Sequence, residues 1–309
     1  MFLSCGDALY DVFQTDHPTA SQVQLSAHIG GSPLNVALGL ARLGNPVEYL
    51  TANSRDALGQ KLQAFMHAEQ IGTQHVVRTD RNTSLAMVSL NQDGHPSYAF
   101  YIEGSADVSL TVQDLPDSAP FAAISLGSYS TVVNPIADSL KALVQRAAPD
   151  TVIAYDPNVR PSIEPNRQVW WDTFNAIAPH ADLIKLYDED IEFLSPGASI
   201  ADFARDALAL GAAWVIVTQG PNGAIAFGPQ GQIEVPGRQV QVVDTVGAGD
   251  TFQAAMLDAL NRQGALSKSG VAQADMQQVL QWAIAAAAVT CSRQGADLPS
   301  FDDVQEQFS

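Results

Sequence analysis

The sequence contains little cysteine and little positive charge, and these absences exclude several classes of protein. Its 309 residues include only two cysteines, Cys5 and Cys291, each inside an apolar run. This usage is typical of reduced core residues and argues against a disulfide framework or a cysteine metal cluster. The 33 acidic residues outnumber the 15 Lys and Arg residues, giving a net charge of −18. Such a charge argues against a nucleic-acid partner and against attraction to an anionic membrane surface.

Long apolar segments are also missing. The longest uninterrupted apolar run, 282–289, is far shorter than the roughly 18 residues that a membrane span requires. The first residues carry Asp7 and Asp11 within a short apolar stretch and have no basic segment, so they do not resemble a secretory signal. We therefore expect a cytoplasmic protein with no membrane partner.

Several familiar catalytic and ligand-binding motifs are absent. No Gly-Lys-Ser/Thr occurs, which excludes a P-loop, and Phe252 stands where a dinucleotide fingerprint requires its third glycine. No Gly-x-Ser-x-Gly supports serine hydrolase chemistry. The six histidines show none of the spacings that are typical of metal ligands.

One stretch, 243–252, combines a bare backbone with a carboxylate. Residues 239–243 alternate with β-branched side chains and predict a strand, and residues 253–260 predict a helix. Gly247 and Gly249 lie between them and allow the backbone to turn tightly and to approach a ligand. The helix N-terminus would present unpaired N–H groups and the positive end of the helix dipole, which together favour an anion such as phosphate.

Asp250 is an unusual residue for such an anion site. A carboxylate there should repel phosphate, unless it accepts the proton of a hydroxyl that attacks the phosphate. A purely structural role as a helix cap is the alternative that the sequence leaves open.

The rest of the chain predicts one α/β domain over residues 1–309 with a small additional sheet. Predicted strands and helices alternate from residue 121 onward, which indicates a mostly parallel sheet with helices on both faces. Residues 83–90 and 98–102 flank a turn signal at 91–94 and predict a hairpin outside this alternation. The hairpin forms either a separate small sheet or an antiparallel edge of the main sheet.

A second informative stretch, 30–44, predicts a well-capped helix. Ser32 is expected as N-cap, Pro33 at the first helical position and Gly44 just after the C-terminal end. Asn35 lies outside the buried stripe of this helix and would face the same space as the turn at Gly30 and Gly31.

Both stretches resemble signatures of the ribokinase-type, or PfkB, carbohydrate kinase family. Asp244-Thr-Val-Gly-Ala-Gly-Asp-Thr-Phe is similar to the second signature, and Gly30-Gly-Ser-Pro-Leu-Asn-Val-Ala is similar to the first one in its fructokinase-like branch. The resemblance extends from Gly6 to Ser300. It implies a ribokinase-like three-layer fold whose β-sheet lid, formed from about 10–29 and 83–104, closes over the sugar and often forms a homodimer interface.

The resemblance also implies roles for individual residues. Asp250 would be the catalytic base, beside an anion hole formed by the backbone of Gly247, Ala248 and Gly249. The residues implied in sugar binding are Asp11, Gly30, Gly31, Asn35 and Arg160. Those implied near the nucleotide are Lys185, Thr218, Gly220 and Gly223. Asp190 would act on Mg²⁺ through water, and the loop for a monovalent cation such as K⁺ would include Asp244, Gly295 and Ser300.

Taken together, the resemblance predicts an ATP-dependent sugar kinase that uses Mg²⁺ and phosphorylates a primary hydroxyl of a hexose. Fructose is the first choice of substrate, and 2-keto-3-deoxygluconate, ribose and a nucleoside are alternatives. Two features depart from the family pattern: residues 100–107 lack the Arg usual in fructokinase-like members, and Tyr187 and Asp190 replace the usual Asn or Ser and Glu. A regulator on the same fold that binds sugar or nucleotide without catalysis is the alternative of another class.

Overall fold

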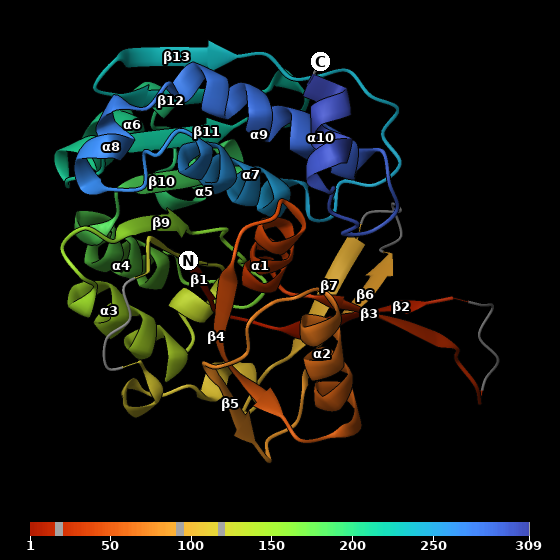
Figure 1. Cartoon of the computed structure of the whole chain (residues 1–309). Helices are drawn as coiled ribbons and strands as arrows, with labels where there is room; N and C mark the ends of the chain where they lie inside the picture. Colours follow the sequence, from red (N-terminus) through yellow and green to blue (C-terminus); the bar gives the residue numbers. More distant parts are fainter. Residues whose placement is uncertain (16–20, 91–95, 117–120, 309) are drawn as a thin grey trace.

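The structure is a computed structural model that describes residues 1–15, 21–90, 96–116 and 121–308. A nine-stranded sheet forms its centre (Figure 1). In spatial order its strands are β13 (Gly231–Val235), β12 (Ala224–Gly228), β11 (Trp214–Thr218), β10 (Leu183–Tyr187), β9 (Val152–Asp156), β8 (Ala123–Gly127), β1 (Phe2–Cys5), β4 (Val47–Ser54) and β5 (Val76–Thr79). All neighbours from β5 to β11 pair in parallel, and β12 and β13 add an antiparallel edge. The mostly parallel sheet is therefore confirmed.

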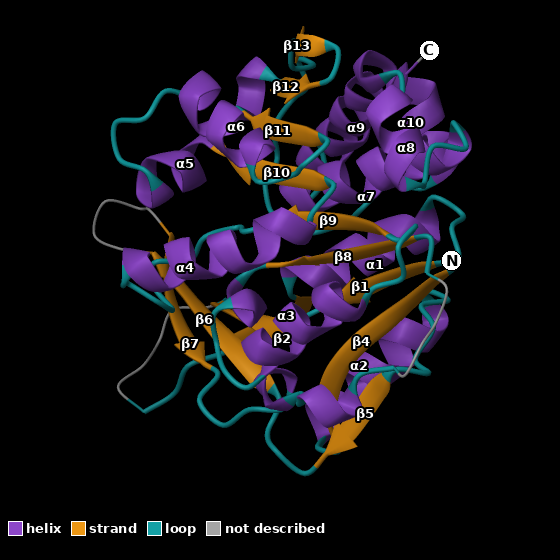
Figure 2. Ribbon diagram, turned by 90° about the vertical axis from the view of Figure 1, so that its left-hand side faces the viewer, coloured by secondary structure: helices purple, strands orange, loops and turns teal. Residues whose placement is uncertain are grey.

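Helices cover both faces of this sheet, as Figure 2 shows. One layer consists of α1 (Ser32–Arg42), α2 (Ala57–Ala68), α7 (Ala248–Arg262), α8 (Lys268–Gln273), α9 (Met276–Cys291) and α10 (Phe301–Phe308). The other consists of α3 (Ile136–Arg146), α4 (Arg167–Ile177), α5 (Asp188–Leu194) and α6 (Ile200–Ala209). Successive strand residues point to opposite layers, so Phe2 packs in one core and Leu3 in the other. Burial on both faces explains why these strands are nearly continuous apolar runs.

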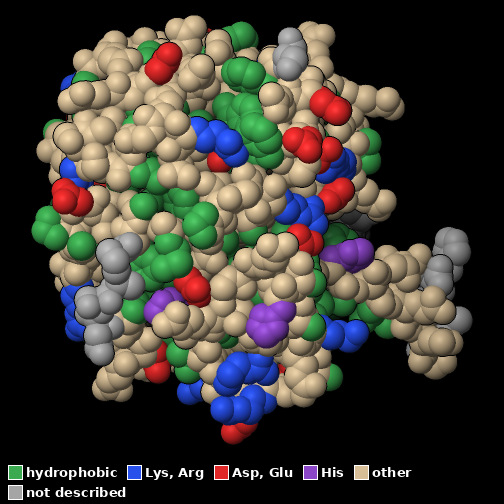
Figure 3. Space-filling view, viewed as in Figure 1, with side chains coloured by type: hydrophobic (Ala, Val, Ile, Leu, Met, Phe, Trp, Pro, Cys, Tyr) green, Lys and Arg blue, Asp and Glu red, His purple; other side chains and the backbone are tan. Residues whose placement is uncertain are grey.

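A second, four-stranded sheet is separate from the central sheet. The predicted hairpin belongs to this small sheet and does not form an edge of the main one. Its strands are β3 (Leu25–Gly30), β2 (Leu9–Gln14), β6 (Ser84–Leu90) and β7 (Pro96–Tyr101), in that order. Two antiparallel hairpins meet through the parallel pair of β2 and β6. The β2–β3 hairpin projects from the body of the molecule (Figures 1 and 3).

Two local predictions were wrong. Residues 239–243 form no strand; Val242 and Val243 are 61% and 59% exposed, and among the described residues this segment takes part in neither sheet. β-Branched alternation describes a side-chain pattern, but a strand also needs a partner for its backbone. The N-cap of α1 is Gly31, at a φ of +110°, and not Ser32. Gly44 does follow the end of that helix, at a φ of +87°.

Asp258 joins the helices of the layer that carries the predicted anion site. It is completely buried, and its carboxylate accepts hydrogen bonds from Asn45 at 2.8 Å, from Arg262 at 2.9 Å and from the Trp282 indole at 3.0 Å. These donors come from the chain after α1, from α7 itself and from α9. The contacts hold α7 at a fixed position against its neighbours.

We expect Asp258→Ala to lower the free energy of unfolding by about 3 kcal/mol, because it leaves a charge and buried donors unpaired. Guanidinium unfolding of both proteins measures this difference. Asp206→Ala is the control, because the ion pair of Asp206 with Arg205 is exposed and its removal should change stability by less than about 1 kcal/mol. A loss of similar size in the two variants would contradict the role given to Asp258.

Candidate active site

A cavity of about 290 Å³ lies where the parallel strands end and the small sheet begins. Its walls come from the segments after β1, β8 and β9, from the last residue of β10, from α1 and the start of α7, and from the small sheet. Ligands in open α/β sheets collect at this edge of the strands. The predicted residues that line the cavity are Asp11, Gly31, Asn35, Arg160, Gly247, Gly249 and Asp250.

The glycine stretch forms the N-terminus of α7. Gly247 is the N-cap at a φ of +77°, which a residue with a side chain rarely adopts, and the helix begins at Ala248. The helix therefore begins five residues earlier than the start expected at 253, and Asp250 lies in its first turn. The backbone N–H groups of this turn and the Asp250 carboxylate belong to the same wall of the cavity.

Asp250 does not act as the N-cap of α7, because Gly247 occupies that position and no side chain caps it. Its carboxylate instead accepts two hydrogen bonds from the start of α1: 2.6 Å from the Ser32 hydroxyl to Oδ1 and 2.8 Å from the Asn35 amide to Oδ2. Burial raises the pKa of Asp250 above its usual range, while the bonds from Ser32 and Asn35 act in the opposite direction. The structure therefore brings Asp250 and Asn35 together in one buried contact.

The glycines before α1 leave room for the Asp11 carboxylate and for the backbone of Asp7. A Cβ at Gly30 would lie 2.3 Å from Asp11 Oδ2, and one at Gly31 would lie 2.4 Å from the Asp7 carbonyl oxygen. Burial raises the pKa of Asp11 to about 6, and the charge of Asp250 contributes to the increase. Burial likewise raises the pKa of Asp7 to about 7, with a contribution from Asp107. These acidic walls favour a neutral ligand with hydroxyl donors over an anionic one.

Lys185 does not line the cavity, although it was predicted to contact a nucleotide. It is completely buried, its ammonium donates to Asp156 at 2.8 Å, and it lies 3.7 Å from the centre of the Tyr187 ring. Burial disfavours its charged form, but the Asp156 carboxylate outweighs this effect and raises the pKa of Lys185. A Cβ built on Gly249 would lie 3.1 Å from Lys185 Nζ, so the buried cation lies just behind the glycine loop.

Asp190 is also buried, and both of its carboxylate oxygens accept backbone N–H groups. Oδ1 accepts from Val159 at 2.8 Å and Oδ2 from Tyr187 at 2.9 Å. These bonds tie the segment after β9 to the start of α5. Arg160, in the same segment, lines the cavity and donates to the carbonyl oxygen of Val159 at 3.1 Å.

Thr218, Gly220 and Gly223 do not line the cavity. Thr218 is the last residue of β11, which lies next to β10 in the parallel sheet, and Gly220 and Gly223 follow it. The Thr218 hydroxyl donates to the Leu186 carbonyl at 3.2 Å. Gly223, at a φ of +101°, packs against the backbone of residues 235–237, whereas a Cβ at Gly220 would meet no atom within 4 Å. Their role at a nucleotide stays a prediction.

The residues predicted for a monovalent cation lie in two segments that meet. Asp244 Oδ1 accepts the Val246 N–H at 3.1 Å, and its Oδ2 accepts the Gly295 N–H at 2.9 Å. Ser300 instead bonds to Asp303 at the start of α10. Asp244 therefore connects the glycine stretch to the segment 295–298, while the Ser300 side chain takes part in a helix cap.

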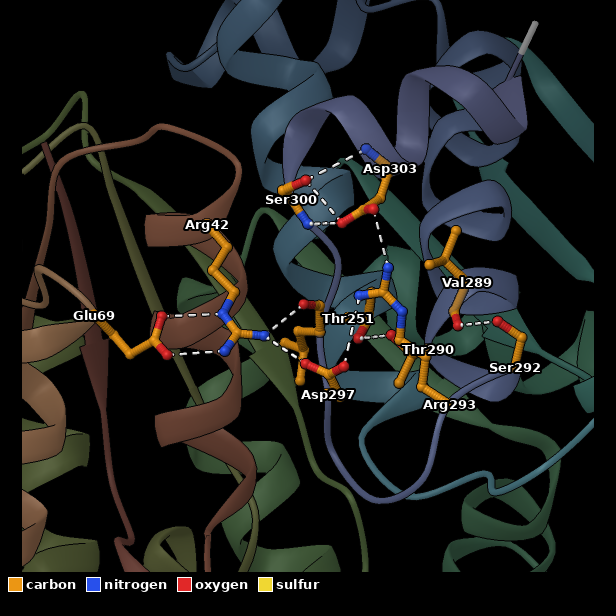
Figure 4. A network of polar contacts seen from close by, with 11 residues as sticks. Arg42, Glu69, Thr251, Val289, Thr290, Ser292, Arg293, Asp297, Ser300 and Asp303 are labelled. Atoms are coloured by element: carbon orange, nitrogen blue, oxygen red, sulfur yellow. Dashed lines mark hydrogen bonds and ion pairs between the residues drawn. The ribbon is translucent and has the colours of Figure 1, made fainter.

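Arg42, at the end of α1, also contacts segment 295–298 (Figure 4). Its guanidinium donates to both carboxylate oxygens of Glu69, at 2.8 and 3.0 Å, and to Asp297 Oδ1 at 2.9 Å. It further donates to the Leu298 carbonyl at 2.7 Å. Ala296 lies behind Gly247, since a Cβ at Gly247 would be 2.9 Å from Ala296 Cβ. Arg42 thus holds the segment that supports the glycine loop from behind.

We expect Arg42→Met to loosen this support. Losing about 1.4 kcal/mol of local stability would speed amide hydrogen exchange at Gly295 and Asp297 about tenfold. Both amides donate hydrogen bonds in the structure, at 2.9 Å to Asp244 and to the Gly295 carbonyl respectively. Exchange measured by mass spectrometry tests this. In the control Arg55→Met, which removes an exposed ion pair with Asp80, exchange in 295–298 should not change.

Several residues that line the cavity were not predicted as site residues, among them Ser32, Ser128, Tyr129, Asn158 and Tyr187. Most lie at or just beyond the end of a parallel strand, where polar residues in a sequence indicate a binding edge. That position was the available signal for Asn158 and Tyr187. Ser32 gave no such signal, because a serine before a helix is normally interpreted as its cap.

Comparison with known proteins identifies the family of the chain. The model for the pfkB family carbohydrate kinases matches residues 2–303. A fructokinase from Rhizobium leguminosarum bv. trifolii is 34% identical over 278 residues, which are 90% of this chain and 85% of the relative. A structure of fructokinase with bound ATP from Xylella fastidiosa superposes with a TM-score of 0.90 at 27% identity and covers 99% of this chain and 97% of that one.

A second similar structure contains several ligands at once. It is a double mutant of fructokinase from Vibrio cholerae O395 in the form that binds fructose, ADP and potassium ion. Its TM-score is 0.86 at 26% identity, with coverage of 100% of this chain and 98% of that one.

Among the described residues of the present chain, no helix has both the length and the apolar character that crossing a membrane would need.

Proposed function

The chain belongs to the pfkB family of carbohydrate kinases, and from this premise we propose that it transfers the γ-phosphoryl group of ATP to fructose. The proposed product is fructose 6-phosphate. Support comes from the fructokinases of R. leguminosarum and X. fastidiosa, which the chain resembles over nearly its whole length. The fold is ribokinase-like, with a mostly parallel central sheet and a separate small sheet.

The observation that carries the proposal is the position of Asp250. It lies in the first turn of a helix whose bare N-terminus faces a cavity with hydroxyl-binding groups. A carboxylate beside a phosphate site repels the phosphate, and accepting the proton of the attacking hydroxyl would give it a function there. A binding protein without catalysis would be expected to lack it.

The mechanism follows from this arrangement. Asp11 and Asn35 are suited to bind sugar hydroxyls, since a carboxylate accepts and an amide both donates and accepts. The hydroxyl to be phosphorylated would give its proton to Asp250 as its oxygen attacks the γ-phosphorus, and the bond to the ADP oxygen breaks. The backbone N–H groups at Gly247, Ala248 and Gly249 would stabilise the charge of the transferring group.

Acidic walls favour a neutral sugar within the family. Asp7, Asp11 and Asp250 all line the cavity, and Arg160 is the only Lys or Arg that lines it among the described residues. An anionic substrate such as 2-keto-3-deoxygluconate would meet repulsion that fructose does not. This argument ranks neutral substrates, fructose among them, above 2-keto-3-deoxygluconate.

Mg²⁺ and a monovalent cation belong to the proposal as well. Among the described residues, no cluster of three or more His, Cys, Asp or Glu could hold a metal ion by itself. Mg²⁺ commonly takes its ligands from substrate phosphates and water, so this donor set fits it, and when bound it offsets phosphate charge. Because backbone donors occupy both oxygens of Asp190, we propose at most a contact through water there. K⁺ is proposed beside Asp244, Gly295 and Ser300.

We further propose that two copies of the chain associate through the small sheet. We also propose that the protein is located in the cytoplasm. Val23 and Leu25 are 49% and 50% exposed near the projecting hairpin, and Tyr101 at the other edge of that sheet is 63% exposed. The cysteines Cys5 and Cys291 are free thiols, which suits a reducing compartment. Light scattering after size exclusion would show a dimer, and Leu25→Glu should shift it toward the monomer.

A coupled assay of ADP release tests the reaction itself. The purified chain would be incubated with ATP, Mg²⁺ and K⁺ and with fructose, 2-keto-3-deoxygluconate, ribose or a nucleoside in turn. Fructose should give the highest kcat/KM, and NMR of the product should place the phosphate at the 6-position. Tight sugar and ATP binding by calorimetry without ADP formation would instead support the regulator.

A further inference from the structure

Asp250 belongs to a row of hydrogen bonds that extends beyond the groups expected to bind substrate. The Asn158 amide donates to the Ser32 hydroxyl at 2.9 Å, and Ser32 donates to Asp250 Oδ1 at 2.6 Å. Because an amide nitrogen can only donate, the single hydroxyl proton of Ser32 must point to Asp250. These three residues lie far apart in the sequence, on the segment after β9 and on α1 and α7.

Asn158 has a backbone conformation that its surroundings must maintain. Its φ is +45°, although it is not a glycine, and it is 1% exposed. Residues with side chains persist in this region only where other contacts fix them, and such positions occur often at functional sites. Asp190 supplies one of those contacts, because its carboxylate accepts the N–H of the next residue, Val159, at 2.8 Å.

We propose that Ser32 and Asn158 are positioning residues that hold the Asp250 carboxylate in the orientation from which it accepts the proton of the sugar hydroxyl. Asp190 supports them by fixing the segment that carries Asn158. This inference rests on the proposed kinase function, because it assumes that Asp250 is the base. Ser32 and Asn158 need not touch the sugar for this role, since they act through Asp250.

The groups that face Asp250 determine how the loss of Ser32 should change its titration. Burial raises the pKa of Asp250; the hydrogen bonds from Ser32 and Asn35 and the charge of Lys185 lower it, and Asp156 raises it. Asp11 also faces it across the cavity, together with the Tyr187 hydroxyl and the Arg160 guanidinium. Removing the Ser32 donor should raise this pKa further, so the ionised base should be lost at a higher pH.

The test is the pH profile of kcat/KM for fructose. In Ser32→Ala the acidic limb should move up by about one pH unit, because a hydrogen bond to a charged group contributes roughly 1.4 kcal/mol or more. Asn158→Asp should move the limb at least as far. Asp tolerates the left-handed backbone and has nearly the same shape, but its carboxylate accepts the Ser32 proton and turns it away from Asp250. Ser32→Thr keeps the hydroxyl and should restore the wild-type limb.

Ser199→Ala is the matched control, because it removes a hydroxyl that caps α6 outside the cavity and should leave the profile unchanged. Circular dichroism of each variant checks that it is folded. An acidic limb that stays within about 0.3 pH unit of wild type in both Ser32→Ala and Asn158→Asp would overturn the positioning role while the kinase assignment stands. A wild-type protein without phosphoryl transfer to any sugar would instead overturn the proposed function.

Discussion

Asp250→Ala is expected to reduce kcat for fructose phosphorylation about a thousandfold or more, while ATP still binds. General base catalysis commonly contributes two to four orders of magnitude, and the described residues offer no second carboxylate in the first turn of α7. ATP binding should persist because the backbone N–H groups of that turn remain. Coupled ADP release measures the rate, and calorimetry with ATP measures binding.

The control for this variant is Glu189→Gln, which removes the negative charge of an exposed residue in the first turn of another helix, α5. It should retain wild-type kcat, and this result would separate the loss of the base from a change in net charge. Activity of Asp250→Ala within about tenfold of wild type would refute the base assignment. Because the acidic Asp250 repels phosphate, ATP affinity should even increase slightly in this variant.

The glycine stretch could be predicted from the sequence because its chemistry is local. Gly247, Gly249 and Asp250 lie within four positions of one another, so a turn, an N-terminus and a carboxylate in one wall follow from the order of residues alone. The alternation of strands and helices was equally informative, because the spacing of apolar residues distinguishes a helix from a strand within each segment. The parallel sheet with helices on both faces follows from that alternation.

The environment of the base could not be predicted, because it depends on contacts between distant residues. Ser32 and Asp250 are separated by 218 positions, and Asn158 and Ser32 by 126. A single sequence shows that Ser32 precedes a helix, which suggests a cap, but Gly31 takes that position and leaves the hydroxyl for Asp250. Lys185 shows the same difficulty. The family resemblance implied a place near the nucleotide, yet the buried Asp156 binds it behind the loop.

Gly249→Ala is expected to abolish most activity for a reason that sequence alone does not reveal. A Cβ at this position would lie 1.3 Å from the Tyr187 hydroxyl oxygen and 2.5 Å from its ring carbon Cζ. Gly249 has no left-handed φ, and it lies within α7. Glycine to alanine in a helix normally stabilises by about 0.5 to 1 kcal/mol, so a loss of stability here would have to come from the collision.

We expect kcat/KM of Gly249→Ala to fall at least about a hundredfold, because the first turn of α7 must shift away from Tyr187 and misplace both the N–H groups and Asp250. The double variant Gly249→Ala with Tyr187→Ala removes the ring and should recover a large part of kcat/KM relative to Tyr187→Ala alone. Recovery would show that the Tyr187 ring, at the end of β10, determines the position of the anion site. Full activity in Gly249→Ala alone would mean that Gly249 does not pack closely against the Tyr187 side chain. The geometry of the proposed anion hole would then be wrong.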